Sequence, residues 1–349
     1  MIPQDNKIAL LHEATLFNGL VPAFRYDGAE DVAAWQQRAY DRLWDLLGLS
    51  RITPAAEELF EITEEFDVPG GHVQAFRFQS EPGYFVPGYI LLPADWQGET
   101  LRGCICLQGH STGMHNSLAM NPDHTPKCKK DMKEIVANDR DFAVRAVKEG
   151  YAAICIEQRY MGTVGIQDGA PGCSAGQSMA TLLLGRTPIG ERVWDVMRLI
   201  DAIEKHIGYI STDGLICMGN SGGGTATFYA ACIERRIRYA MPSCAFCTYQ
   251  DSIVDIHHCA CNYIPGIAPD FDMGDLAGLI APRNLVIVNG VEDTIFPDHG
   301  VRKAYAVAER MFAALGGKLA LVTGSGGHRL YADPAWEALH GFEKENGIR

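Results

Sequence analysis

From residue 102 onward, the sequence alternates short apolar runs with longer segments of helical pattern. The apolar runs are RGCICLQG, YAAICIE, GLICMGN, RYAMPS, NLVIVNG and KLALVTG, and the helical segments lie at about 140–149, 189–206, 223–233 and 300–315 and after Pro334. Nearly continuous apolar runs are typical of parallel strands that are buried on both faces of a sheet. The pattern therefore predicts an α/β fold with a mostly parallel, doubly wound sheet.

The first hundred residues follow another pattern. Apolar residues recur at helical spacing over 30–48, whereas the later runs at 57–66, 72–79 and 85–92 are separated by turn sequences. These runs predict a helix followed by antiparallel strands that join the sheet.

The chain divides on this basis into two parts. We expect a helical N-terminal extension over residues 1–55 and one α/β domain over residues 56–349. Two long insertions, at 109–139 and 244–283, each follow a predicted strand. Because ligands bind at the carboxyl ends of strands in open α/β sheets, we expect both insertions to be functional loops.

Composition and charge exclude several classes of partner. The formal net charge is −13, so a nucleic acid or an anionic membrane surface would be repelled. The sequence has no basic leader and no run of 18 or more apolar residues, which predicts a cytoplasmic protein without membrane association. The eleven cysteines, several of them inside predicted strands, are expected to be reduced thiols. The oligomeric state, including a homo-oligomer, stays open.

The run GNSGGG at 219–224 lies where a predicted strand meets a predicted helix. A phosphate loop would need Lys and then Ser or Thr after its last glycine, but Thr225 follows Gly224 directly. A dinucleotide fingerprint would need a different glycine spacing. The remaining interpretation is the G-x-S-x-G nucleophile elbow, which makes Ser221 a candidate nucleophile. A glycine-rich turn in which Ser221 only caps the helix is the alternative.

Candidate partners for Ser221 follow in the order that this motif requires. Asp293 comes just after the run NLVIVNG and is the candidate acid, with Glu292 as its rival. His328 lies on a later glycine-rich loop and is the candidate base. Either residue, taken alone, could be an ordinary loop residue, whereas the order Ser, Asp, His favours a catalytic triad.

An acyl-transfer serine also needs donors for the oxyanion of the tetrahedral intermediate. The backbone N–H of Gly222, directly after the candidate nucleophile, is the first candidate. The second should come from the sequence QGHSTG that follows the run CICL, where we assign it to the N–H of His110, with Ser111 as the alternative.

Over roughly residues 30–349, the chain resembles the α/β-hydrolase superfamily, specifically its acetyl xylan esterase-like and dienelactone hydrolase-like members. The resemblance rests on AWQQRAYDRLWDLLG, LQGHSTG, GRTPIGERVWDVMRLIDAI before GNSGGGT, and APRNLVIVNGVEDTIFP before GGHRLY. It implies Ser221 as nucleophile, Asp293 as acid and His328 as base, with no cofactor. Gln108 stands where the family usually has histidine, and the nucleophile is serine where dienelactone hydrolases have cysteine.

The resemblance implies a serine ester hydrolase, specifically a carbohydrate esterase of the acetyl xylan type for short acyl groups, with a small-molecule or oligosaccharide ester as substrate. Polar and aromatic residues in the two insertions also favour a hydroxyl-rich alcohol over a lipid. A peptidase of the prolyl oligopeptidase type is an alternative, although the first 100 residues are too few for its extra domain. A non-catalytic binding module on the same fold is another.

The second insertion also contains six residues that could bind zinc. They are Cys244, Cys247, His257, His258, Cys259 and Cys261. Their spacing does not match a common zinc module, because C-x-C replaces the second C-x-x-C. We therefore expect buried thiols and pocket-lining histidines, with no metal, and keep a structural zinc as the alternative.

Overall fold

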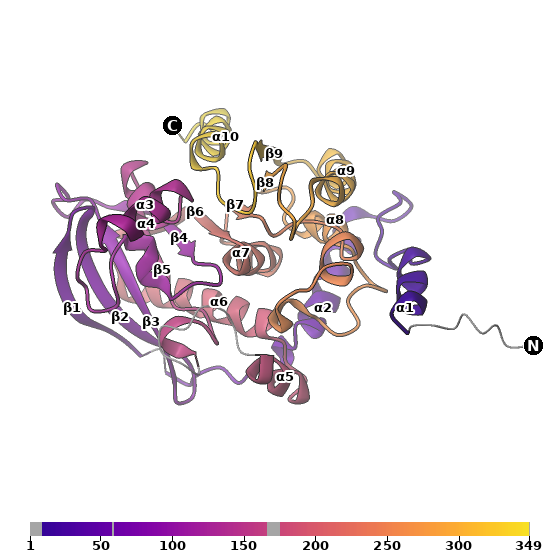
Figure 1. The fold of residues 1–349 in the computed structure, drawn as a ribbon, viewed down its shortest axis with the longest axis horizontal. Helices are drawn as coiled ribbons and strands as arrows, with labels where there is room; N and C mark the ends of the chain where they lie inside the picture. Colours follow the sequence, from indigo (N-terminus) through magenta and orange to yellow (C-terminus); the bar gives the residue numbers. More distant parts are fainter. Residues whose placement is uncertain (1–8, 58, 166–174, 349) are drawn as a thin grey trace, which may run out of the picture.

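A mixed sheet organises the chain (Figure 1). The computed structural model describes residues 9–57, 59–165 and 175–348. Within them, the strand order is β1-β2-β3-β5-β4-β6-β7-β8-β9. The strands are β1 (Phe60–Val68), β2 (Gly71–Glu81), β3 (Tyr84–Leu92), β4 (Leu101–Leu107), β5 (Ala152–Ile156), β6 (Ile210–Asn220), β7 (Tyr239–Ser243), β8 (Asn284–Gly290) and β9 (Lys318–Gly324).

The sheet is antiparallel at one side and parallel at the other. The pairs β1–β2, β2–β3 and β3–β5 are antiparallel, and every pair from β5–β4 through to β8–β9 is parallel. Every residue of β5, β7 and β8 is buried, as the continuous apolar runs predict. The predicted α/β class, with antiparallel strands first, is confirmed.

Helices cover both faces of the sheet and form two apolar cores. Those described are α1 (Ala9–Asn18), α2 (Val32–Leu46), α3 (Lys129–Ala137), α4 (Phe142–Lys148), α5 (Ala175–Leu183), α6 (Pro188–His206), α7 (Gly222–Ile233), α8 (Met273–Leu276), α9 (Asp298–Leu315) and α10 (Ala332–Glu345). Helices α4 and α10 bury Phe142 and Trp336 in one core, whereas α6, α7 and α9 bury Leu199, Phe228 and Phe312 in the other.

The segment before β1 contributes to the second core. In α2, Trp35, Ala39 and Leu43 are spaced four residues apart and share the buried face. The Asp31 side chain accepts a hydrogen bond from Ala34 N and so caps the first turn. Helix α1 lies at the end of the molecule opposite β1 (Figure 1). The division into 1–55 and 56–349 stays a prediction, and the first eight residues lie outside the described part.

Both long insertions begin at the carboxyl ends of parallel strands, β4 and β7. Insertion 109–139 contains η2 (Met114–Leu118) and α3, and insertion 244–283 contains η4 (Gln250–Val254), η5 (Ala260–Asn262), α8 and η6 (Ala277–Leu279). Two further short 3-10 helices are η1 (Leu49–Arg51) and η3 (Gly162–Val164). The insertions therefore meet at the edge of the sheet where α7 begins.

The six candidate zinc ligands of the second insertion do not come together. Cys244 lies beside Asp293 and His328, whereas Cys259 and Cys261 lie beside His110. The Sγ atom of Cys247 is 3.9 Å from the carbonyl of Pro297, and His258 bonds to Ser252 and Asn262. The six residues therefore do not form one cluster, and the expectation that the insertion binds no metal stays a prediction. The ten cysteines of the described residues are free thiols.

In the described part of the chain, no helix combines the length and the apolarity that crossing a bilayer requires.

Candidate active site

Ser221 occupies a sharp turn between β6 and α7. Its backbone has φ 55° and ψ −125°, a strained conformation for a residue with a side chain, and its N–H donates to the Ser243 carbonyl at 2.8 Å. A Cβ on Gly219 would lie 2.6 Å from the backbone of Gly223, and one on Gly223 would lie 2.0 Å from the carbonyl oxygen of Leu107. Glycine is thus required on both sides of the serine, which is the geometry of a nucleophile elbow.

The alternative role of Ser221, as a capping residue, does not fit this turn. Ser221 is the residue before α7, yet its side chain accepts no hydrogen bond from the first turn of the helix. The hydroxyl is therefore not committed to the helix and remains at the carboxyl edge of the sheet.

Asp293 and His328 form an acid–base pair. Asp293 Oδ2 is 2.9 Å from His328 Nδ1, and Oδ1 accepts hydrogen bonds from Ile295 N at 2.8 Å and Phe296 N at 3.0 Å. Burial acts to raise the pKa of Asp293, but the His328 ring and the two N–H donors outweigh it and hold the pKa below its usual value. Asp293 is thus a carboxylate at neutral pH. Its rival Glu292 is exposed.

The loop that carries His328 crosses the strand end next to Ser221. Ser243 Oγ lies 2.8 Å from Asn220 Oδ1 and 3.3 Å from the Arg329 carbonyl, while the Ser243 carbonyl accepts the N–H of Ser221. The Nε2 atom of His328 is buried and has no hydrogen-bond partner among the described residues. A proton acceptor is therefore left unpaired at the carboxyl edge where Ser221 lies.

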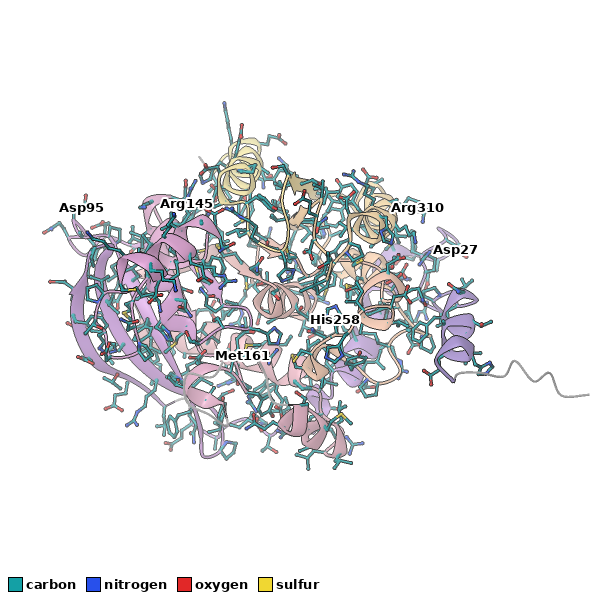
Figure 2. All side chains as sticks on the ribbon, in the orientation of Figure 1. Asp27, Asp95, Arg145, Met161, His258 and Arg310 are labelled. Atoms are coloured by element: carbon teal, nitrogen blue, oxygen red, sulfur yellow. The ribbon has the colours of Figure 1, made fainter. Side chains whose placement is uncertain are left out.

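Two side chains that sequence reasoning did not assign to the site surround this pair. The ring of Phe296 stacks on His328 with centroids 6.1 Å apart and forms a T-shaped pair with His258, the residue that Figure 2 labels. Cys244 lies beside Asp293 and His328, and burial together with the Asp293 charge raises the pKa of its thiol. Cys244 therefore stays a neutral thiol. The signal available in the sequence was its position directly after the strand that neighbours the elbow.

The candidate oxyanion donors lie on either side of the serine. Gly222 opens α7, where backbone N–H groups have no partner within the helix. A Cβ on Gly109 would lie 3.1 Å from Ser221 Cβ, so the loop after β4 passes directly beside the serine. A Cβ on Gly222 would lie 2.9 Å from His110 Cε1 and 3.0 Å from Met161 Cε. The assignment of the second oxyanion donor to the N–H of His110, with that of Ser111 as the alternative, stays a prediction.

Gln108 and Glu157 hold the loop after β4 in place through hydrogen bonds. Gln108 Nε2 donates to Ser117 Oγ at 2.9 Å and to the Arg140 carbonyl at 2.7 Å, so Gln108 braces the loop instead of facing the substrate. Glu157 accepts hydrogen bonds from Met114 N at 3.2 Å and Thr163 N at 3.3 Å.

Glu157 is the positioning group that sequence reasoning missed. Its residue is 2% exposed, and burial raises the pKa of its carboxyl to about 7. The available signal was an acidic residue at the carboxyl end of the apolar run YAAICIE, where side chains face the site.

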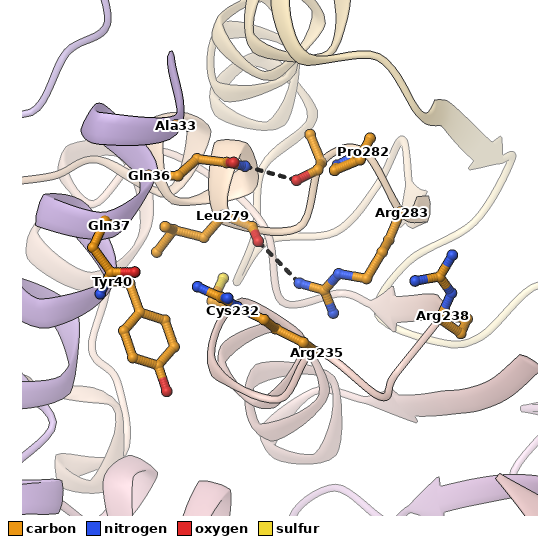
Figure 3. A pocket seen from close by; sticks show the side chains of 11 residues that line it. Ala33, Gln36, Gln37, Tyr40, Cys232, Arg235, Arg238, Leu279, Pro282 and Arg283 are labelled. Carbon is orange, nitrogen blue, oxygen red and sulfur yellow. Dashed lines mark hydrogen bonds between the residues drawn. The ribbon is translucent and has the colours of Figure 1, made fainter. Parts of the chain in front are cut away.

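A separate cavity of about 380 Å³ lies between α2, the C-terminal end of α7 and the loop before β8 (Figure 3). Gln36 donates to the carbonyl of Ala281 at 2.7 Å, and Arg283 donates to that of Leu279 at 2.9 Å. The lining includes Arg235 and Arg238 but none of the candidate catalytic residues. The cavity is therefore distinct from the site at the elbow.

The sheet order, the elbow and the acid–base pair together define the α/β-hydrolase fold. Among solved structures, the chain is similar to "a putative acetyl xylan esterase" from Bacteroides fragilis NCTC 9343, with TM-score 0.74 and 14% identity over 96% of this chain and 86% of that one. It is also similar to a glucuronoyl esterase from Solibacter usitatus, with TM-score 0.63 and 14% identity over 93% and 97% of the two chains.

A third structure extends this group, and the sequence comparisons add a relative. Acetyl xylan esterase 1 from Thermoanaerobacterium sp. JW/SL YS485 matches with TM-score 0.58 and 16% identity over 89% of this chain and 93% of that one. "Putative hydrolase YtaP" of Bacillus subtilis (strain 168) is 25% identical over 138 residues, which is 39% of this chain and 46% of that protein. The chain thus matches less than half of that relative's length. No model of a known protein family matches.

These comparisons confirm the predicted fold and the resemblance to acetyl xylan esterase structures. At identities of 14–16%, the structural matches establish a shared fold, and what the chain does has to be argued from its own residues.

Proposed function

We propose that the chain is a serine carboxylic ester hydrolase that acts through Ser221, His328 and Asp293. The observation that carries the proposal is the strained backbone of Ser221, with φ 55°, at a turn where glycines are sterically required. Such strain is characteristic of functional sites, and the Asp293–His328 pair supplies the base that a serine nucleophile needs. The names of the similar structures support an esterase.

The proposed cycle uses side chains of this chain alone. Nε2 of His328 takes the proton of Ser221 Oγ as the oxygen attacks the ester carbonyl, and Asp293 stabilises the imidazolium through Nδ1. The N–H groups of Gly222 and His110 hold the oxyanion. The imidazolium then protonates the leaving alcohol. Water repeats the sequence on the acyl-enzyme, which releases the acid and restores Ser221.

The surroundings of the oxyanion position favour a short acyl group. The His110 ring and the Met161 methyl group lie 2.9 and 3.0 Å from the position of a Cβ on Gly222, which is closer than van der Waals contact. Little room therefore remains for a long acyl chain beside the Gly222 N–H. A hydroxyl-rich alcohol fits the polar insertions that border the site. We therefore propose short acyl esters of carbohydrates as the substrate class, in a protein that needs no cofactor for the reaction.

The test compares Ser221→Ala with the unchanged protein on several substrate classes. Acetylated xylo-oligosaccharides should release acetate, and aryl acetate should be hydrolysed faster than aryl octanoate. Ser221→Ala should lower turnover by about 10⁴-fold or more while the circular dichroism spectrum is unchanged. Near-normal turnover in the folded variant would refute the assignment of the nucleophile.

The same panel separates the competing functions. Rates that rise from acetate to octanoate, without release of acetate from sugars, would indicate a general esterase. Cleavage of peptides but not esters would indicate a peptidase. Labelling by a fluorophosphonate probe that disappears in Ser221→Ala would exclude a non-catalytic binding module.

A further inference from the structure

A group of soft ligands lies in the wall of the candidate active site. The ligand atoms of His110, Cys259 and Cys261 all lie within 4.8 Å of one another. Cys261 Sγ is 3.3 Å from His110 Nε2 and 3.2 Å from Cys259 Sγ. His110 comes from the loop after β4, whereas both cysteines come from the insertion after β7. Residues 151 positions apart in the sequence thus converge through a single imidazole and two thiols.

A buried arginine lies beside one of the two sulfurs. Arg192 is 2% exposed, and its Nη1 atom is 3.4 Å from Cys261 Sγ. A buried guanidinium beside a sulfur stabilises the charged form of that sulfur, which is the form that binds metals. His110 and Cys259 are partly exposed, so an ion from solvent can reach the group.

We propose that His110, Cys259 and Cys261 bind one thiophilic divalent cation of the Zn²⁺ type. The chemistry of the donors suits such an ion, since two thiolates and one imidazole occur together in zinc sites. Bond lengths of about 2.3 Å to sulfur and 2.0 Å to nitrogen, with tetrahedral angles, place the sulfurs about 3.8 Å apart and sulfur about 3.5 Å from nitrogen. The distance between the two sulfurs, 3.2 Å, would need to widen by about 0.6 Å, and the distance between Cys261 Sγ and His110 Nε2, 3.3 Å, by about 0.2 Å.

When the ion binds, the two thiols exchange their protons for bonds to the metal. Two S–H bonds break and their protons pass to solvent, two metal–sulfur bonds form, and the Nε2 lone pair of His110 supplies the third ligand. The bound ion ties the loop after β4 to the insertion after β7, so it stabilises the wall of the site. The ion has no step in the proposed ester hydrolysis.

The experiment titrates the chelator-treated, reduced protein with Co²⁺, whose thiolate complexes absorb light. We expect one cobalt per chain with a sulfur-to-cobalt charge-transfer band, displacement of the band by one equivalent of Zn²⁺, and a higher melting temperature with either ion. Cys259→Ser and Cys261→Ser should each weaken cobalt binding by at least tenfold. Cys128→Ser, which removes an exposed thiol elsewhere, is the matched control and should bind as the unchanged protein does.

Two further comparisons separate loss of metal binding from misfolding and from loss of hydrolase activity. If Cys261→Ser, at a buried position, fails to fold, Cys259→Ser at the half-buried position carries the comparison. Ser221→Ala should bind cobalt unchanged, so the metal site can fail or succeed independently of the hydrolase proposal. The proposal is overturned if the unchanged protein gives no thiolate band, or if the band persists in both cysteine variants.

Discussion

The buried carboxyl of Glu157 should make the stability of this protein depend on pH in an unusual direction. Glu157 is 2% exposed and is held by the N–H groups of Met114 and Thr163 beneath the loop that passes Ser221. Burial raises its pKa from 4.5 to about 7, against the effect of those donors. We therefore consider the substitution Glu157→Gln, which keeps the shape of the side chain and removes the titration.

The folded and unfolded states lose the Glu157 proton at different pH values, which sets the direction in which the unfolding free energy changes with pH. Between pH 4.5 and about 7, the folded protein keeps the Glu157 proton, whereas an unfolded chain with an ordinary carboxyl has lost it. The free energy of unfolding therefore falls as the pH rises through this window and levels off above it. At about 1.4 kcal/mol for each tenfold change in proton affinity, the total loss is about 3 kcal/mol.

The assay is urea unfolding of the unchanged protein and of Glu157→Gln at intervals from pH 4.5 to 8. One oxygen of Glu157, Oε2, lies 3.3 Å from both N–H donors, so the amide oxygen of the variant can accept the same two hydrogen bonds, and the variant differs chiefly in having no titratable proton. As the pH rises across the range, the unfolding free energy of the unchanged protein should therefore fall by about 3 kcal/mol relative to that of Glu157→Gln. Glu292→Gln removes an exposed carboxyl and is the matched control, which should follow the unchanged protein. A difference between Glu157→Gln and the unchanged protein that stays constant with pH would refute the reasoning.

The sequence was sufficient for most of the fold because parallel strands have a strong local signal. All seven residues of β8 are buried, so its run NLVIVNG is continuous in apolar character apart from its polar end, and the predicted and observed strands coincide. Helix α3 was not predicted within insertion 109–139. Met132, Ile135 and Val136 have helical spacing, but the helix buries Ile135 alone and has no side-chain cap, so the periodic signal is short and no capping residue marks where it begins.

The candidate site likewise contains some residues that the sequence marks and others that it does not. Ser221 could be found because its glycine neighbours are required locally, and the structure places Asp293 on His328 as the order of the motifs predicts. Glu157 is marked only by its position at the end of the run YAAICIE, and the loops that it holds could not be predicted. The partner of Cys261 could not be predicted either, because both depend on where irregular loops run in space. For the same reason, the sequence does not show that the six cysteines and histidines of the second insertion lie in separate groups. Cys261 instead meets His110, which comes from the other insertion.

Two further substitutions test the electrostatics of the molecule. Asp293→Asn should lower turnover by about 10³–10⁴-fold, because the imidazolium loses its stabilising carboxylate. Glu292→Gln should change turnover little. If steady-state kinetics rank the two variants in the reverse order, the acid is Glu292. Arg159→Met should lower the free energy of unfolding by about 3–5 kcal/mol in urea denaturation, because Arg159 donates from two nitrogens to Asp195 at 2.8 Å each, and both side chains are buried. Loss of the guanidinium leaves the Asp195 carboxylate without its charged partner, so the double variant Arg159→Met/Asp195→Leu should recover part of the lost stability. A double variant that is no more stable than Arg159→Met would show that the stranded Asp195 charge does not set the cost, since Arg159 also pairs with Glu81 at 2.5 Å and Glu191 at 3.7 Å.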